Sequence, residues 1–144
     1  MKVKIINGPN LNLLGRRQTD IYGTNDFMSF LKKLREKYPA IMIDHFQSNI
    51  EGEIVNIIHE VGFSYDGIII NAGGYTHTSI SIADALDAVE TPAIEVHISN
   101  ILAREEYRQI SFISNACHGT IMGFGLDSYR LGLEGLIEIV RRKK

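Results

Sequence analysis

The chain has 144 residues, of which 44% are hydrophobic, so it can form one domain with a substantial core, residues 1–144, and leaves little room for a second. Its net charge of -2 arises without a long basic run, which argues against a nucleic-acid partner. The single cysteine, Cys117, excludes an internal disulfide framework. The absence of a long apolar stretch or signal-peptide pattern argues against membrane association. We therefore expect a cytoplasmic protein.

Apolar, β-rich runs alternate with runs of helical periodicity along the chain. The first strand is predicted at residues 3–6, and the loop that follows it, residues 7–23, is longer than a compact α/β domain requires. This loop carries Arg16, Arg17 and Tyr22. Two cations and a phenol on such a segment suggest a functional lid.

The next elements are two helices and two strands. A first helix has the apolar face Phe27, Phe30, Leu31, Leu34 and Tyr38, and a strand at residues 41–46 follows it. Ser48 and Glu51 lie at the spacing of a capping box and predict the start of a second helix. The apolar face of that helix is Ile54, Val55, Ile57, Ile58 and Val61. The continuous apolar run at residues 67–71 is typical of a strand buried on both faces of a parallel sheet.

The third helix, predicted at residues 79–89, has more apolar surface than a sheet alone would cover. Ser81, Asp84 and Asp87 form only a narrow polar edge, so we expect this helix to pack against the sheet and against another subunit. Two strands are predicted next, one at residues 93–97 and one near residues 119–124. A final helix is predicted from about Leu126.

Five strands that alternate with helices indicate an α/β fold with a doubly wound, parallel sheet between two helical layers. Right-handed crossovers favour a flavodoxin-like three-layer sandwich with strand order 2-1-3-4-5. In such sheets, ligands bind beyond the carboxyl ends of the strands, near the point where the strand order reverses.

Polar residues follow three of the predicted strands at that edge. Asn7 and Asn10 follow the first strand, and the segment NAGGYTHTS, residues 71–79, follows the third. Glu95 and His97 share one face of the fourth strand, where the carboxylate can orient the imidazole. The sequence therefore predicts a ligand site built from all three segments.

Each of these groups also has a purely structural interpretation. Asn7 and Asn10 could satisfy turn backbone beside Pro9, and single histidines are more often structural than catalytic. The charged residues between Arg104 and Arg108 could form the solvated face of a short helix. Their convergence at one edge of the predicted sheet favours the functional interpretation.

Several kinds of chemistry are excluded by residue type. The first loop is not a P-loop, no G-x-G-x-x-G follows a strand, and no cluster with metal-ligand spacing occurs. No lysine lies at a strand end, where a Schiff base would need one. Tyr22, the two arginines and the Glu95 and His97 pair remain, and they suit proton abstraction from, and proton return to, a small polar molecule.

Eight segments of the chain resemble the type II 3-dehydroquinate dehydratases of the shikimate pathway. They are NGPNLNLLGRR, IYG, FQSN with EGE, NAGGYTHTS, EVHISN with AREEYR, and GFG, and they extend from about Val3 to the final helix. The resemblance implies a flavodoxin-like fold, a dodecamer built from four trimers, and neither a metal nor an organic cofactor. It implies anti elimination of water from 3-dehydroquinate, through an enolate, to give 3-dehydroshikimate.

The resemblance also implies a role for each matching residue. Tyr22 would be the base, acting as a phenolate, and Arg17 would stabilise the phenolate and the developing negative charge. Asn10 would hold a water on the enolate oxygen, while His97, oriented by Glu95, would protonate the departing hydroxyl. The substrate-binding residues would be Asn71, His77, Ile98, Ser99 and Arg108, with Asp84 supplied by a neighbouring subunit.

An inactive flavodoxin-like scaffold, or a module that only binds a small ligand, is the alternative. It conflicts with the intact set of Arg17, Tyr22 and His97. The chain departs from the family in the segment SNACHGT, residues 114–120, which lacks the proline of many members. That departure touches none of the expected catalytic residues.

Overall fold

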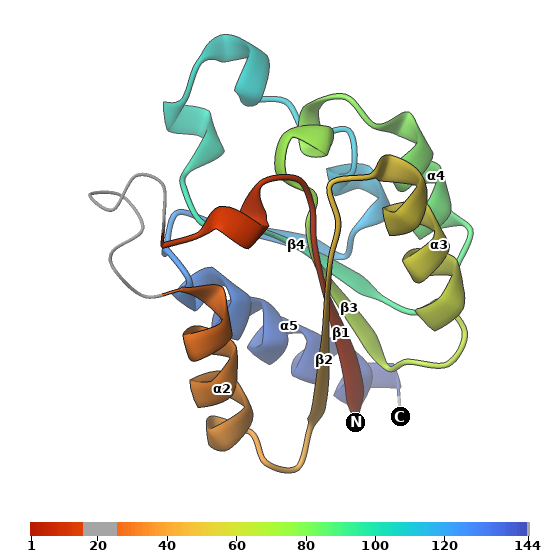
Figure 1. Ribbon diagram of the computed structural model, residues 1–144. Coiled ribbons are helices and arrows are strands. Elements are labelled where there is room, and N and C mark those ends of the chain that lie inside the picture. Colours follow the sequence, from red (N-terminus) through yellow and green to blue (C-terminus); the bar gives the residue numbers. More distant parts are fainter. Residues whose placement is uncertain (16–25, 144) are drawn as a thin grey trace.

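The computed structural model describes residues 1–15 and 26–143, and its strands form a single parallel sheet. The strands are β1 (Lys2–Asn7), β2 (Met42–Gln47), β3 (Gly67–Asn71), β4 (Ala93–His97) and β5 (Gly119–Met122). They lie in the order β2-β1-β3-β4-β5 (Figure 1). This order confirms the predicted topology and places the reversal of strand order between β1 and β3.

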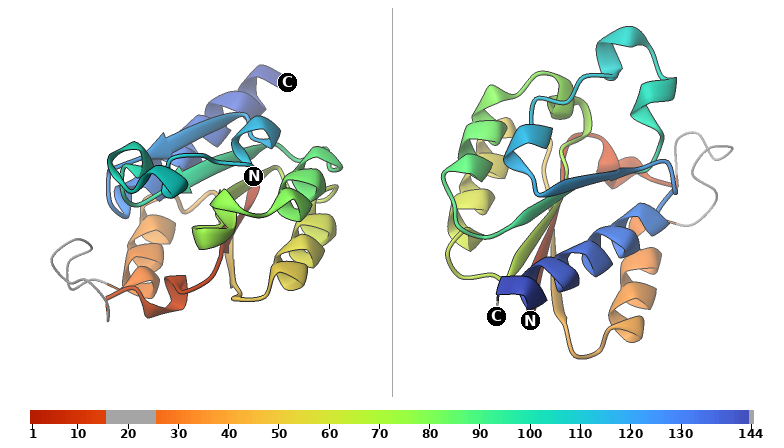
Figure 2. Two further views of the ribbon diagram at one scale, coloured as in Figure 1. Left: turned by 90° about the horizontal axis from the view of Figure 1, so that it is seen from above. Right: turned by 180° about the vertical axis from the view of Figure 1, so that it is seen from behind.

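Helices cover both faces of the sheet. They are α2 (Phe27–Lys37), α3 (Glu51–Val61), α4 (Ile80–Asp87) and α5 (Asp127–Lys143). The pair α2 and α5 lies on one face and the pair α3 and α4 on the other, which gives three layers (Figures 1 and 2). Among the residues described, no helix combines the length and the apolar character needed to cross a bilayer.

Two apolar clusters fill the spaces between the layers. On one face Val3 and Ile5 of β1 pack with Leu31 of α2 and Leu133 of α5, and on the other face Ile6 packs with α3 and α4. This alternation follows from the pleat of β1, which directs successive side chains to opposite faces. Every residue of β3 is buried, as its continuous apolar run predicts for a central strand.

The predicted capping box at the start of α3 is wrong. The N-cap is Ile50, and Ser48 lies two residues before it, where its Oγ accepts a hydrogen bond from the Ile50 backbone N at 2.9 Å. The same hydroxyl donates to Glu53. Glu51 instead accepts from the hydroxyl of Ser79, so it ties the start of α3 to the start of α4. Sequence spacing alone could not reveal this tertiary partner.

Three other predicted boundaries shift by a few residues. The second strand lies one residue later than predicted, and α4 is shorter at both ends because Ser79 is its N-cap and accepts from Ile82 N at 3.0 Å. The last strand ends at Met122, since Gly123 adopts a φ of 91° and turns the chain away. Cys117 lies between η5 and this strand.

Short 3-10 helices carry the connections over the carboxyl edge of the sheet. They are η1 (Leu11–Leu13), η2 (Gly73–His77), η3 (Ile101–Ala103), η4 (Glu106–Arg108) and η5 (Ser114–Ala116). The last three join β4 to β5, where the chain forms these turns in place of a crossover α-helix. They bring polar and charged side chains above the ends of β3 and β4.

Candidate active site

A cavity of about 410 Å³ lies at the carboxyl ends of the central strands. The predicted site residues that line it are Asn10, Asn71, His77, His97, Ile98, Ser99 and Arg108. Glu95 lies directly behind His97, and Asp84 is exposed on α4, apart from the lining residues. Arg17 and Tyr22 lie outside the described residues. The structure therefore brings together every described residue that the sequence places in one subunit's site.

Two glycines allow the first two loops of the site to touch. A Cβ on Gly8 would lie 2.3 Å from the backbone oxygen of Ala72, so no larger residue fits there. Gly73 has a φ of 59°, and a Cβ on it would lie 2.9 Å from the oxygen of Pro9. Glycine satisfies both the close approach and the left-handed conformation. These glycines seat the loop that carries Asn10 against the loop that carries His77.

Asn10 is held by its backbone in a conformation that few residues adopt. Its φ of 69° is left-handed, which asparagine tolerates better than most residues with a side chain. Asn49 Oδ1 accepts from the Asn10 backbone N at 3.0 Å and from Gln47 Nε2 at 3.1 Å. Gln47 also donates to the backbone oxygen of Gly8 at 3.1 Å. The FQSN segment therefore fixes the turn on which Asn10 projects.

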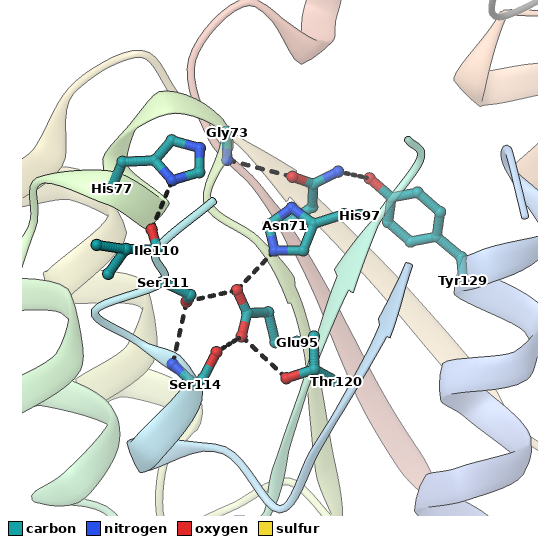
Figure 3. Close-up of polar contacts among 10 residues, drawn as sticks. All are labelled: Asn71, Gly73, His77, Glu95, His97, Ile110, Ser111, Ser114, Thr120 and Tyr129. Carbon is teal, nitrogen blue, oxygen red and sulfur yellow. Dashed lines mark hydrogen bonds and ion pairs between the residues drawn. The ribbon is translucent and has the colours of Figure 1, made fainter. Parts of the chain in front are cut away.

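A buried chain of hydrogen bonds supports Asn71 from below the cavity (Figure 3). Asn71 Nδ2 donates to the hydroxyl of Tyr129 at 3.0 Å. That hydroxyl donates to Asn7 Oδ1 at 2.7 Å. Asn71 Oδ1 accepts from Gly73 N at 3.2 Å. Burial raises the pKa of Tyr129, so its hydroxyl keeps the proton that it donates. The Asn71 amide is thereby held in one orientation.

The chain of hydrogen bonds ends at a neutral histidine. Asn7 Nδ2 lies 3.2 Å from His45 Nε2. Burial, followed by the charges of Arg35 and Lys4, lowers the pKa of His45 to about 4, so its ring is neutral near pH 7 and can accept this hydrogen bond. His45 has a structural position here, because the centre of its ring also lies 4.7 Å from that of Phe27.

His97 and Glu95 form the pair that their alternation on the fourth strand predicts. His97 Nε2 lies 2.6 Å from Glu95 Oε1, and the two side chains are 7% and 0% exposed (Figure 3). Burial raises the pKa of Glu95, but hydrogen bonds from His97 and Ser114 outweigh it and hold that pKa below its ordinary value. Glu95 is therefore ionised, and His97 donates to it through Nε2. The other ring nitrogen, Nδ1, remains for a ligand in the cavity.

Charged and polar groups of the β4–β5 connection line the other side of the cavity. Arg104, Glu105 and Arg108 are among the lining residues, and Arg108 Nε lies 3.2 Å from Glu105 Oε2. The side chains of Glu105 and Arg108 are 58% and 34% exposed at the short helix η4, so the interpretation as a solvated face agrees with the structure, and the same side chains also line the cavity. His77 Nδ1 lies 2.7 Å from the backbone oxygen of Ile110, which ties η2 to the same connection. Guanidinium groups at a cavity wall suit a carboxylate ligand.

Sequence reasoning missed five residues of this arrangement: Arg104, Ser111, Ser114, Thr120 and Tyr129. The three hydroxyl residues lie 16, 19 and 25 positions from Glu95, so spacing gives no signal for them. A signal did exist for Tyr129. It occupies the buried stripe of an amphipathic helix, where a phenol needs a polar partner.

Within residues 1–15 and 26–143, no three histidine, cysteine or acidic side chains cluster as metal ligands. What the described groups offer is one imidazole oriented by an ionised carboxylate, one fixed amide and two guanidinium groups around the same cavity. This arrangement can bind a small polyhydroxy carboxylate and give a proton to it.

A family model described as dehydroquinase class II matches residues 1–137. A curated 3-dehydroquinate dehydratase from Clostridium perfringens (strain SM101 / Type A) is 51% identical, with 99% of this chain and all of that protein covered.

Solved structures give the same result. The type II dehydroquinase from Butyrivibrio crossotus superimposes with a TM-score of 0.90 at 44% identity, over 95% of this chain and 97% of that one. The type II dehydroquinase from Propionibacterium acnes gives a TM-score of 0.85 at 36% identity, over 97% of this chain and 96% of the other.

Proposed function

The chain belongs to the class II dehydroquinase family, and we propose that it is the hydro-lyase that converts 3-dehydroquinate to 3-dehydroshikimate in the shikimate pathway. The observation that carries this function is the His97 and Glu95 pair at the wall of a cavity that also presents Arg108 and Asn71. The substrate is a cyclic hydroxy ketone with a carboxylate. Its dehydration requires a proton donor for the hydroxyl, a cation that binds the carboxylate and an oriented amide.

The reaction begins with Tyr22 and Arg17, as the family resemblance implies. The Tyr22 phenolate takes a proton from the carbon next to the ketone, and the electron pair of that C–H bond moves to form an enolate. A phenol must lose roughly 2 to 3 pKa units to be ionised near neutrality, or about 3 to 4 kcal/mol. An arginine about 4 Å away, at an intermediate effective dielectric, supplies on the order of 4 kcal/mol. Arg17 alone is therefore sufficient if the site excludes water.

The elimination is completed at His97. A water held by Asn10 hydrogen-bonds the enolate oxygen. As the enolate collapses, the new double bond forms and the C–O bond to the hydroxyl breaks. Protonated His97 gives a proton to the departing hydroxyl, which leaves as water. Since Glu95 holds Nε2, His97 Nδ1 is the atom that carries this proton. A proton then passes from Tyr22 to solvent and from solvent to His97, which restores the starting state.

The substrate's carboxylate and hydroxyl groups are bound by the lining residues named above. Asn71, His77, Ser99 and Arg108 supply polar groups, and the end of β4 at Ile98 supplies the wall beside them. The orientation of Asn71 matters because its amide can present a donor and an acceptor in fixed directions only while Tyr129 and Gly73 hold it.

Removal of one hydroxyl tests this support. Tyr129→Phe should raise the KM for 3-dehydroquinate about tenfold, which corresponds to about 1.4 kcal/mol, and should change kcat less. It should also destabilise the fold by about 1 to 3 kcal/mol, since Asn7 and Asn71 lose a buried partner. Tyr38→Phe is the matched control, because Tyr38 donates to Glu134 on the surface, away from the cavity. Equal KM values for both variants would contradict the role of Tyr129.

We also propose that one catalytic domain, residues 1–144, assembles in the cytoplasm into a dodecamer of four trimers. The α4 surface supports contact between subunits, because Ile80 is 65% exposed and Asp84 lies one turn further along the same helix. In the assembly, Asp84 reaches the active site of a neighbouring subunit. Light scattering during turnover should then give the mass of twelve chains. A stable, fully active monomer would exclude the shared site.

The function itself is tested by ultraviolet absorbance when the purified protein meets 3-dehydroquinate in the presence of a chelator. The product is conjugated and absorbs where the substrate hardly does, so a steady rise is expected. A folded oligomer that gives no rise would identify the chain as an inactive scaffold or a binding module.

A further inference from the structure

Glu95 is the most heavily hydrogen-bonded side chain of the site, and its bonds come from three hydroxyl groups besides His97. Ser111 Oγ donates to Oε1 at 2.7 Å, while Ser114 Oγ donates to Oε2 at 2.6 Å and Thr120 Oγ1 to Oε2 at 3.1 Å (Figure 3). With His97 at 2.6 Å, each carboxylate oxygen accepts two hydrogen bonds. An ionised carboxylate offers about four acceptor positions, so Glu95 has each of them filled.

The directions of these bonds favour the ionised form of Glu95. The Ser111 oxygen also accepts from the backbone N of Ser114 at 3.2 Å, which directs its own hydrogen to the carboxylate. A proton on Oε1 would face the Ser111 donor that is already in place, and a proton on Oε2 would require the Ser114 or Thr120 hydroxyl to turn its own hydrogen away, in a side chain that is 0% exposed. The surroundings of Glu95 therefore oppose its protonation.

We propose that Ser111, Ser114 and Thr120 are positioning residues, which keep Glu95 ionised so that His97 always donates through Nε2 and presents Nδ1 to the substrate. This inference rests on the proposed role of His97 as proton donor. Without the hydroxyls, the pair could shift its proton to Glu95 and leave a neutral imidazole that cannot complete the elimination. The hydroxyls act through Glu95 and do not touch the substrate.

All three hydroxyls belong to the segment that leads from the cavity back into the sheet. Ser111 precedes η5, Ser114 begins it, and Thr120 lies on β5 opposite Glu95 of β4. The same connection carries Arg104 and Arg108 of the cavity wall. One buried carboxylate thus anchors the connection and sets the protonation of the adjacent imidazole.

Cys117 is a further titratable side chain close to this pair. The Cys117 thiol lies near Glu95, and burial, followed by the charges of Glu95 and of Asp87 on α4, raises the pKa of that thiol to about 12. It therefore stays neutral over the pH range of an activity profile. Among the described residues, the imidazole of His97 is the ring that hydrogen-bonds Glu95 directly.

Infrared difference titration measures the protonation of Glu95 without turnover. The band of the protonated carboxyl is assigned from its loss in Glu95→Gln. A hydrogen bond to a charged group corresponds to about one to two pKa units, so Ser114→Ala should raise the protonation midpoint of Glu95 by at least about one pH unit. Thr120→Val should raise it less, because its hydrogen bond is longer. Ser114→Thr retains a hydroxyl and should return the midpoint toward the wild-type value.

The control is a buried threonine of similar type that does not contact the pair. Thr91 precedes β4 at its opposite end and donates to the backbone oxygens of Val61 and Tyr65. Thr91→Val should destabilise the protein and leave the midpoint unchanged. If Ser114→Ala matches Thr91→Val in this titration, the hydroxyls only anchor the connection and the proposal is wrong.

The pH profile of kcat/KM gives a second readout. In Ser114→Ala the acid limb should become steeper near the raised midpoint of Glu95, while the alkaline limb stays in place. An unchanged acid limb alongside a raised infrared midpoint would mean that Glu95 ionisation does not matter for turnover, which overturns the positioning role. A wild-type protein without dehydratase activity would instead refute the proposed function. The infrared titration would still test whether the hydroxyls keep Glu95 ionised, because it needs no turnover.

Discussion

His97→Gln should lower kcat by about three orders of magnitude, because the departing hydroxyl loses its proton donor. The glutamine amide can still donate to Glu95 Oε1, so the buried carboxylate keeps a partner and the fold stays intact. The KM for 3-dehydroquinate should change only a few-fold.

Solvent exchange separates this role from that of the base. In deuterated water, His97→Gln should still exchange the proton next to the ketone, because that step does not involve His97. His59→Gln is the matched control, since His59 is exposed on α3 and away from the cavity. A His97→Gln enzyme within tenfold of the wild-type kcat would exclude His97 as the donor.

Tyr22→Phe should reduce kcat by a similar factor, roughly a thousandfold, through loss of the general base. It differs from His97→Gln in one decisive respect: the proton next to the ketone should no longer exchange with solvent. The acid limb of the kcat/KM profile, which reports ionisation of the phenol, should also be lost.

Tyr65→Phe is the control for this variant. The Tyr65 hydroxyl donates to Asp44 and its side chain does not line the cavity, so its removal should leave turnover and exchange unchanged. Exchange that persists in Tyr22→Phe would assign the base to another group.

The fold was predictable because the pattern of burial follows local rules. The run GIIIN is typical of a strand buried on both faces, and the apolar stripes of α2 and α3 alternate with such strands as they do in a doubly wound sheet. The His97 and Glu95 pair was predictable for the same reason, since alternate residues of a strand share a face. Helix starts were less predictable, as Glu51 bonds to Ser79 across the structure.

The supporting hydroxyls could not be predicted because their partners are distant in sequence. Tyr129 reaches Asn7 across 122 positions, and Thr120 reaches Glu95 only because β5 pairs with β4. Serine and threonine satisfy backbone and side-chain partners throughout a protein, so their occurrence in a connection carries no indication of which acceptor they will meet. The register of the sheet must be known first.

The most direct test of the account uses 3-dehydroquinate that carries deuterium at only one of the two positions on the carbon next to the ketone. If Tyr22 takes a proton from the face opposite the departing hydroxyl and His97 protonates that hydroxyl, substrate labelled anti to the hydroxyl should give product without deuterium. Substrate labelled syn to the hydroxyl should give product that keeps its deuterium. Loss of the syn deuterium, or loss of both labels equally, would contradict the proposed centre.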